Sequence, residues 1–179
     1  MKHAANIITI SRIILSASLV FLLNCNLLFI VVYTVSGLSD ALDGFIARKT
    51  HTQSTLGARL DSIADAVMFA AIIYSIVMLA GTKIYNMSCF IIAVFILRIF
   101  NLIFAAFKYH SLVLVHTIGN KLSGLLVFSA PVIFILFQNS VELFGYFVCT
   151  FTFLAAAEET LIHVRYNEVD LNRRGLFIK

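Results

Sequence analysis

The sequence predicts an all-helical integral membrane protein with six transmembrane helices. Of its 179 residues, 61% are hydrophobic and 12% are charged, and the mean hydropathy is +0.99. An ordinary soluble domain carries about 25% charged residues. Several apolar runs approach the roughly 20 residues that a helix needs to cross a bilayer. No stretch of soluble composition is long enough for a second domain, so we expect one transmembrane domain over residues 1–179.

The apolar runs and the short polar connectors between them define the expected spans. These fall at about residues 7–24, 27–49, 56–80, 84–107, 118–138 and 141–165. The charged last stretch, from about residue 166, is expected to lie outside the lipid. Because six is an even number, both termini are expected on the same side of the membrane.

The basic residues indicate which side that is. Only Lys83 lies clearly at the end opposite the termini. Ten others lie at the end that the termini share: Lys2, Arg48, Lys49, Arg59, Lys108, Lys121, Arg165, Arg173, Arg174 and Lys179. By the positive-inside rule this end is cytoplasmic. The net charge of +4 suits an anionic lipid surface and is no argument for nucleic acid, since these residues are spread along membrane-facing ends.

The first predicted span carries a polar stripe. Asn6, Thr9, Ser11 and Arg12 interrupt its apolar residues. Such a stripe suits a helix that packs against other helices better than a cleaved signal peptide, so we expect this span to be retained.

Acidic residues are concentrated in residues 39–66, "SDALDGFIARKTHTQSTLGARLDSIADA", which holds four of the nine in the chain. Asp40 and Asp43 are three residues apart near the end of the second span, and therefore share a helix face. Asp61 and Asp65 are four apart at the start of the third span and share a face as well. Because the connecting loop is short, we expect the two helices to be antiparallel neighbours whose carboxylates converge.

Four carboxylates at a membrane boundary need compensating positive charge. A charged side chain at the bilayer centre costs roughly 2.5–3.5 kcal/mol, and clustered carboxylates repel one another. Arg48 and Arg59 offset part of this charge, and an ion-pair network that joins the two helices is one explanation. Two divalent cations, Mg²⁺ or Mn²⁺, would balance all four charges with the oxygen ligands that these ions prefer, and such pairs serve displacement at phosphorus.

The spacing in this window resembles the signature of the CDP-alcohol phosphotransferases, also called CDP-alcohol phosphatidyltransferases. The matching pattern is Asp40-x2-Asp43-Gly44-x2-Ala47-Arg48-x8-Gly57-x3-Asp61-x3-Asp65. It covers 26 residues, and the six predicted spans extend the likeness to most of the chain. The N-terminal "ANIITISRI" is also similar to the usual start of the family, although Ala5 stands where a proline is common.

The resemblance implies an enzyme of phospholipid biosynthesis. It would transfer a phosphatidyl group from CDP-diacylglycerol to a small alcohol and release CMP. Asp40, Asp43, Asp61 and Asp65 would hold two metal ions, and Asp65 would also act as general base toward the hydroxyl of the acceptor. The active site would face the cytoplasm in the cell membrane, and analogy with the family implies a homodimer.

A nucleotide site is implied beside the metals. Its members would be Asp43, Gly44, Ala47, Arg48, Ser54 and Gly57. The two glycines and the alanine would let the CDP moiety approach the backbone, and Arg48 would present its planar fork to the diphosphate or the cytosine edge. Taken alone, these small residues also fit plain helix packing.

The sequence indicates the acceptor alcohol less clearly than it indicates the metal and nucleotide sites. Lys121, in "HTIGNKLSG", and Arg98, well inside the fourth span, are the candidate contacts. Lys121 also fits a side chain that snorkels to headgroups, and Arg98 fits a buried pair with Glu158 or Glu159. Related enzymes that use glycerol phosphate often have Gly-Lys-x-Lys-Thr here, and this chain departs from that pattern at three positions. Glycerol 3-phosphate is the first expectation, with serine, inositol phosphate or another alcohol as alternatives.

Two other classes remain as alternatives. A magnesium-dependent membrane prenyltransferase would need a second aspartate-rich motif, and none follows Asp65. A cation transporter would need charged positions along a transmembrane path, whereas these aspartates lie near one face.

Overall fold

The computed structural model describes residues 2–50, 55–109, 117–166 and 175. Within these ranges, the side chains of residues 2–8, 40–50, 55–56 and 58–59 lie outside the description. Contacts between Cα atoms divide the chain into two compact units, Met1–Leu79 and Ala80–Lys179. Each is described by itself, and the single domain expected over residues 1–179 stays a prediction.

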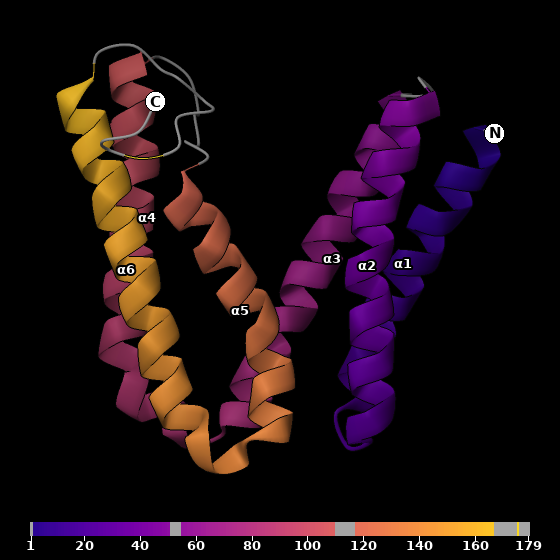
Figure 1. Ribbon diagram of the computed structural model, residues 1–179, viewed down its shortest axis with the longest axis horizontal. Coiled ribbons are helices and arrows are strands. Elements are labelled where there is room, and N and C mark those ends of the chain that lie inside the picture. Colours follow the sequence, from indigo (N-terminus) through magenta and orange to yellow (C-terminus); the bar gives the residue numbers. More distant parts are fainter. Residues whose placement is uncertain (1, 51–54, 110–116, 167–174, 176–179) are drawn as a thin grey trace. The chain divides into compact units, whose positions relative to one another are not determined.

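The regular structure of the described residues is entirely helical (Figure 1). The first unit contains α1 (Lys2–Leu22), α2 (Asn26–Thr50) and nearly all of α3 (Thr55–Ala80). The second contains α4 (Lys83–Tyr109), α5 (Ile118–Leu136), the short 3₁₀ helix η1 (Gln138–Ser140) and α6 (Val141–Arg165). These bounds follow the predicted spans closely except in α1, which begins at Lys2 rather than at residue 7, because hydropathy and polar connectors determine where membrane helices begin and end.

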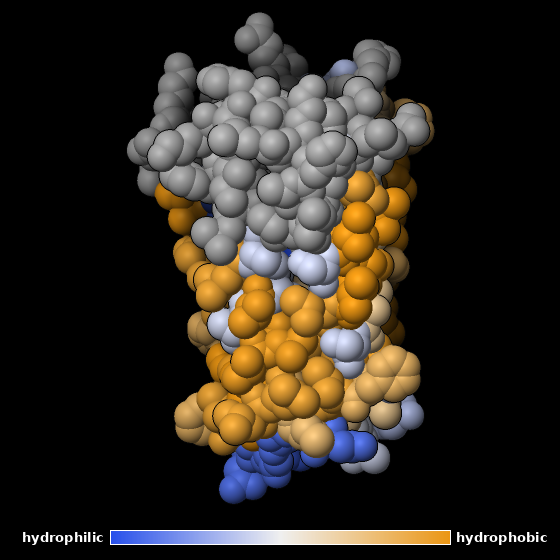
Figure 2. Space-filling model, turned by 90° about the vertical axis from the view of Figure 1, so that its right-hand side faces the viewer, coloured by the Kyte–Doolittle hydropathy of each residue, from blue (hydrophilic) through white to orange (hydrophobic). Residues whose placement is uncertain are grey.

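Four helical stretches are long and apolar enough to cross a bilayer. They are Leu60–Ala80, Lys83–Tyr109, Ile118–Leu136 and Gln138–Arg165. Shorter apolar stretches, Thr9–Leu22 and Asn26–Ser39, lie in α1 and α2. Figure 2 shows one face on which most of the coloured residues are hydrophobic and the strongly hydrophilic ones gather at one end. An all-helical, multi-pass membrane architecture follows, while six full spans and cytoplasmic termini stay predictions.

The first unit is held together by contacts that α1 makes with its two neighbours. α1 packs along α2, where Phe29 and Tyr33 are buried and stack with ring centroids 5.5 Å apart. Toward α3, the Ser16 hydroxyl donates to Met68 Sδ at 3.4 Å, and both side chains are buried. This seam fixes α1 beside the part of α3 that carries two of the predicted site aspartates.

The second unit is organised around α6, which packs against both α4 and α5. Small residues let α4 approach closely: a Cβ added at Gly145 would collide with the buried Met87 side chain. Asn101 Nδ2 donates to the Ala156 carbonyl at 2.8 Å, and the Thr160 hydroxyl donates to Asn101 Oδ1 at 2.6 Å. Polar side chains therefore tie these helices together inside an otherwise apolar unit.

Candidate functional site

Asp61 and Asp65 lie one helical turn apart near the beginning of α3, and both carboxylates are accessible. The side chains are 51% and 61% exposed, respectively. Residues four apart project from the same face of a helix. The face that the sequence predicted for these two aspartates is therefore present in the structure.

A buried arginine of α1 binds both carboxylates. Arg12 is only 1% exposed, and its Nη2 donates to Asp61 Oδ1 at 2.7 Å and to Asp65 Oδ1 at 3.2 Å. The same nitrogen lies 3.5 Å from the main-chain oxygen of Asp61. A buried guanidinium is costly unless it is paired, and these two carboxylates supply the pairing.

The three residues fit the described part of the expected metal site. Two carboxylates and one guanidinium leave one negative charge, and the accessible groups are hard oxygen donors of the kind that Mg²⁺ and Mn²⁺ bind. Among the described side chains, no group of three or more Asp, Glu, His or Cys residues forms a candidate metal site. Asp40 and Asp43, which would complete the set, are not among those side chains.

Most of the expected nucleotide site falls outside the described side chains. The backbone of α2 includes Asp40, Asp43, Gly44, Ala47 and Arg48, so all five lie on a helix, as expected. Their side chains are not described, and Ser54 lies wholly outside the described residues. Gly57 lies in the first turn of α3. The roles predicted for these residues stay predictions.

A second polar cluster lies in the other unit, around Arg98 of α4. Arg98 Nη1 donates to Glu159 Oε2 of α6 at 3.1 Å and to Asn120 Oδ1 of α5 at 2.9 Å. Arg98 Nη2 donates to the Ser123 hydroxyl at 3.2 Å, and Asn120 Nδ2 donates to Glu159 Oε2 at 3.0 Å. The pair with a glutamate that was one explanation for Arg98 is thus formed with Glu159.

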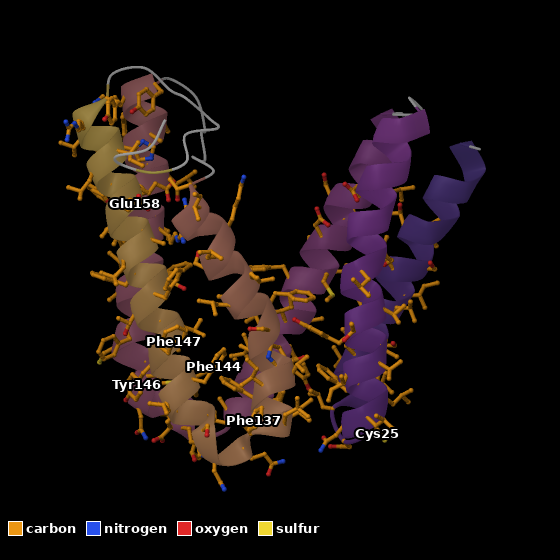
Figure 3. All side chains as sticks on the ribbon, viewed as in Figure 1. Cys25, Phe137, Phe144, Tyr146, Phe147 and Glu158 are labelled. Carbon is orange, nitrogen blue, oxygen red and sulfur yellow. The ribbon has the colours of Figure 1, made fainter. Side chains whose placement is uncertain are left out.

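The remaining acceptor candidate and the second glutamate lie near this cluster in sequence. Lys121 is exposed, and Arg98 bonds to the neighbouring residues Asn120 and Ser123. Glu158, labelled in Figure 3, lies against Gly119: a Cβ added at this glycine would be 3.0 Å from Glu158 Oε2. The acceptor contacts predicted for Lys121 and Arg98 stay predictions.

Sequence reasoning did not assign three of these residues to a site. Arg12 was part of the polar stripe of the first span, and an arginine inside a span is a functional candidate by default, so a signal was present. Asn120 and Ser123 carried no comparable signal, because short polar residues at the start of a helix have many uses. Only the packing of α4, α5 and α6 brings them to Arg98.

Comparison with known proteins identifies the family. The sequence pattern of the CDP-alcohol phosphatidyltransferases matches residues 2–157. A CDP-diacylglycerol–serine O-phosphatidyltransferase of Methanocaldococcus jannaschii is 48% identical over 56 residues, which are 31% of this chain and 26% of the relative. The match therefore spans about a quarter of that relative's length. No solved structure matches the chain. Since the family pattern covers most of the sequence, the chain belongs to the CDP-alcohol phosphatidyltransferase family, and the family and enzyme class expected from the sequence are confirmed.

Proposed function

We propose that this protein transfers a phosphatidyl group from CDP-diacylglycerol to a small alcohol and releases CMP. The observation that carries the proposal is the exposed Asp61–Asp65 pair on one face of α3, held by the buried Arg12 in a chain of this family. An ion pair that only stabilises the fold needs no access for a ligand, and its acid can be as buried as Glu159 of the second unit, which is 2% exposed. Here the arginine is buried and the carboxylates remain accessible to a ligand.

The chemistry requires divalent ions and a base. Asp40, Asp43, Asp61 and Asp65 would hold two Mg²⁺ or Mn²⁺ ions, which would neutralise the diphosphate and stabilise the charge on the departing CMP. The acceptor oxygen bonds to the phosphorus that carries diacylglycerol, while the bond from that phosphorus to the CMP oxygen breaks. A carboxylate oxygen of Asp65 takes the proton of the acceptor hydroxyl.

The nucleotide half of the substrate would lie on the α2 side of the site. Arg48 would bind the diphosphate through its fork, with Gly44 and Ala47 leaving room for the nucleotide against the helix. Ser54 and Gly57 would border the nucleotide at the start of α3. Family membership supports this assignment, because the signature residues are all present in the sequence.

Among acceptors, we now place serine ahead of glycerol 3-phosphate. The M. jannaschii relative is named a serine transferase. In addition, Asn120 and Ser123, which replace the glycine and second lysine of the glycerol-phosphate pattern, bind Arg98, whose charge Glu159 already matches. A phosphorylated acceptor needs cations that are not already matched by acidic groups. Arg98 is therefore a poor contact for an acceptor phosphate, which leaves Lys121 for that role, and the name of the relative is what places serine first.

We place the reaction at the cytoplasmic surface of the cell membrane. The apolar helices support insertion in a bilayer, and the basic residues at the ends shared with the termini support a cytoplasmic site. By analogy with the family, we also propose that the protein forms a homodimer.

The experiment that tests this function is CMP release by the full-length protein in lipid nanodiscs. CDP-diacylglycerol is supplied with Mg²⁺ or with EDTA, and with serine, glycerol 3-phosphate, inositol phosphate or no acceptor. We expect release that needs both Mg²⁺ and an acceptor, and that is fastest with serine. Absence of CMP release under every condition would contradict the proposal. Diphosphate release from a prenyl diphosphate, or metal flux into vesicles without CMP release, would instead favour the prenyltransferase or the transporter.

A further inference from the structure

Arg12 lies on α1, outside the 26-residue acidic signature, yet it contacts two of the signature carboxylates. We propose that Arg12 is a positioning residue that holds Asp61 and Asp65 in the orientation in which they bind a divalent cation. The inference rests on the proposed function, because it concerns the metal ions that this function requires. It adds a third helix to a site that the signature confines to α2 and α3.

The geometry of the contact suits this role. One nitrogen, Nη2, binds one oxygen from each of two carboxylates that are a helical turn apart. Without a shared donor, two exposed carboxylates at this spacing repel each other, and each loses rotamer freedom when a metal binds. A planar guanidinium with charge-assisted hydrogen bonds restricts both side chains before the metal arrives.

The arginine itself is held firmly. Its side chain is almost completely buried, and one turn further along α1 the buried Ser16 donates to Met68 of α3. Leu19 and Ala64, on the same two helices, are completely buried. A group that is fixed by such packing can orient partners that are themselves exposed.

A direct contact with the diphosphate of the substrate is a different role for an arginine near this site. That role needs a guanidinium that is accessible to the ligand, as a bidentate clamp on phosphate would be. Arg12 is 1% exposed, and its Nη2 is directed at Asp61 and Asp65. The burial therefore favours action through the carboxylates over contact with the nucleotide.

Arg12 has two opposing effects on the affinity of the site for a cation, and their balance can be measured. A positive charge beside the carboxylates weakens their attraction for a cation, whereas fixed orientation strengthens binding. Loss of a group that orients metal ligands typically costs 10–100-fold in metal affinity or activity. We therefore expect the orienting effect to exceed the repulsion between Arg12 and the metal.

The test is Mn²⁺ binding to the full-length protein in detergent, without CDP-lipid, measured from the electron paramagnetic resonance signal of free Mn²⁺. We expect Arg12→Gln to bind Mn²⁺ about 10–100-fold more weakly than wild type. The matched control is Ser18→Ala on the same helix, which loses the hydrogen bond from its hydroxyl to the Leu15 carbonyl within α1; its Mn²⁺ affinity should equal that of wild type. Equal or tighter binding by Arg12→Gln would overturn the proposal.

Arg12→Lys keeps the positive charge, but its ammonium lies one bond closer to the backbone than Nη2 and sits on a flexible stem, so it should not hold both carboxylates in the same way. We expect its Mn²⁺ affinity to lie between those of wild type and Arg12→Gln. If circular dichroism shows that Arg12→Gln does not fold, the lysine variant carries the test, and an affinity equal to wild type would overturn the positioning role. Failure of wild type itself to bind Mn²⁺ would instead remove the metal ions of the proposed function, and the positioning role with them. The two failures are thus distinguishable.

Discussion

The two units each contain an arginine bound to acidic side chains, but their burial is reversed. In the first unit the arginine is buried, at 1% exposed, and its partners Asp61 and Asp65 are more than half exposed. In the second unit the acid is buried: Glu159 is 2% exposed, while its partner Arg98 is 32% exposed. Both pairs join helices that are distant in sequence.

The difference in burial distinguishes two kinds of charged group. In the first unit the negative charges are accessible to a ligand, whereas in the second unit the negative charge is neutralised by neighbouring side chains. Glu159 accepts hydrogen bonds from Arg98 and Asn120, and Arg98 also binds Ser123, so the cluster supplies its own partners. A buried carboxylate with such partners tolerates its low-dielectric surroundings. Asp61 and Asp65 instead remain more than half exposed while they bind a buried arginine. The Glu159 cluster of the second unit suits structural support, and the Asp61–Asp65 pair of the first unit suits ligand binding.

Among the variants considered, the largest effect is expected at Asp65. Asp65→Asn removes the proposed base but keeps the shape of an exposed side chain, so we expect CMP release to fall about 10²–10⁴-fold while the helical content stays unchanged. The measurement is magnesium-dependent CMP release with serine, accompanied by circular dichroism. An Asp65→Asn protein with full activity would show that another group takes the proton.

A change at Glu159 should lower the stability of the protein, whereas the change at Asp65 lowers its activity. Glu159→Ala leaves Arg98 and Asn120 without their carboxylate partner, and breaking a buried pair of this kind costs about 3–5 kcal/mol. Because Arg98 is partly exposed, we expect an effect near the lower end of this range, measured by unfolding in sodium dodecyl sulfate. The control Glu159→Gln keeps an acceptor oxygen and should be less destabilising. A Glu159→Ala protein of wild-type stability that has lost CMP release would assign this cluster to the chemistry.

Substitution of Gly145 tests how closely α6 packs against α4 in the second unit. Gly145→Ala forces the sulfur end of the buried Met87 side chain to move. We expect the cost of this overpacking, about 1–3 kcal/mol, to exceed the gain in helix propensity of about 0.5–1 kcal/mol that the alanine also brings. The matched control is Gly124→Ala on α5, where a Cβ meets nothing within 4 Å; there the gain in helix propensity should stabilise by about 0.5–1 kcal/mol. Thermal unfolding should therefore shift in opposite directions. A shift to lower stability in both variants would show that the difference in packing does not control the outcome.

Lys121 should show the smallest effect. Its side chain is exposed, so Lys121→Met should change stability by no more than about 0.5 kcal/mol and should leave the KM for serine unchanged. A raised KM for glycerol 3-phosphate, at unchanged kcat, would mean that this lysine binds an acceptor phosphate. That result would restore glycerol 3-phosphate as the first acceptor and give the second unit a part in the site.

The helices could be predicted from the sequence because hydropathy alone marks most of their bounds. The end of each apolar run coincides with a polar connector, and the expected 118–138 span and the observed Ile118–Leu136 helix agree closely. The predicted first span, 7–24, is shifted from α1, which begins at Lys2, since the polar residues Lys2, His3 and Asn6 lower the hydropathy of a segment that is nevertheless helical.

The site could be predicted only in part. Fixed spacing on one helix was enough to place Asp61 and Asp65 on one face, because helical periodicity is local. The contact of Arg12 with this face depends on the packing of α1 against α3, about fifty residues apart in sequence, which no local pattern encodes. The partners of Arg98 could not be chosen for the same reason, since Glu158 and Glu159 are adjacent and only helix rotation distinguishes them.

The most direct measurement of the central claim is iron-mediated cleavage of the backbone. Fe²⁺ bound in place of Mg²⁺, with ascorbate and peroxide, cuts peptide bonds near the ion, and mass spectrometry locates the cuts. We predict cuts both in α2 around residues 40–48 and in α3 around residues 57–65, suppressed by excess Mg²⁺ and lost when Asp61 and Asp65 are both changed to Asn. Cuts confined to one of these helices, or absent from both, would contradict a metal site shared between them.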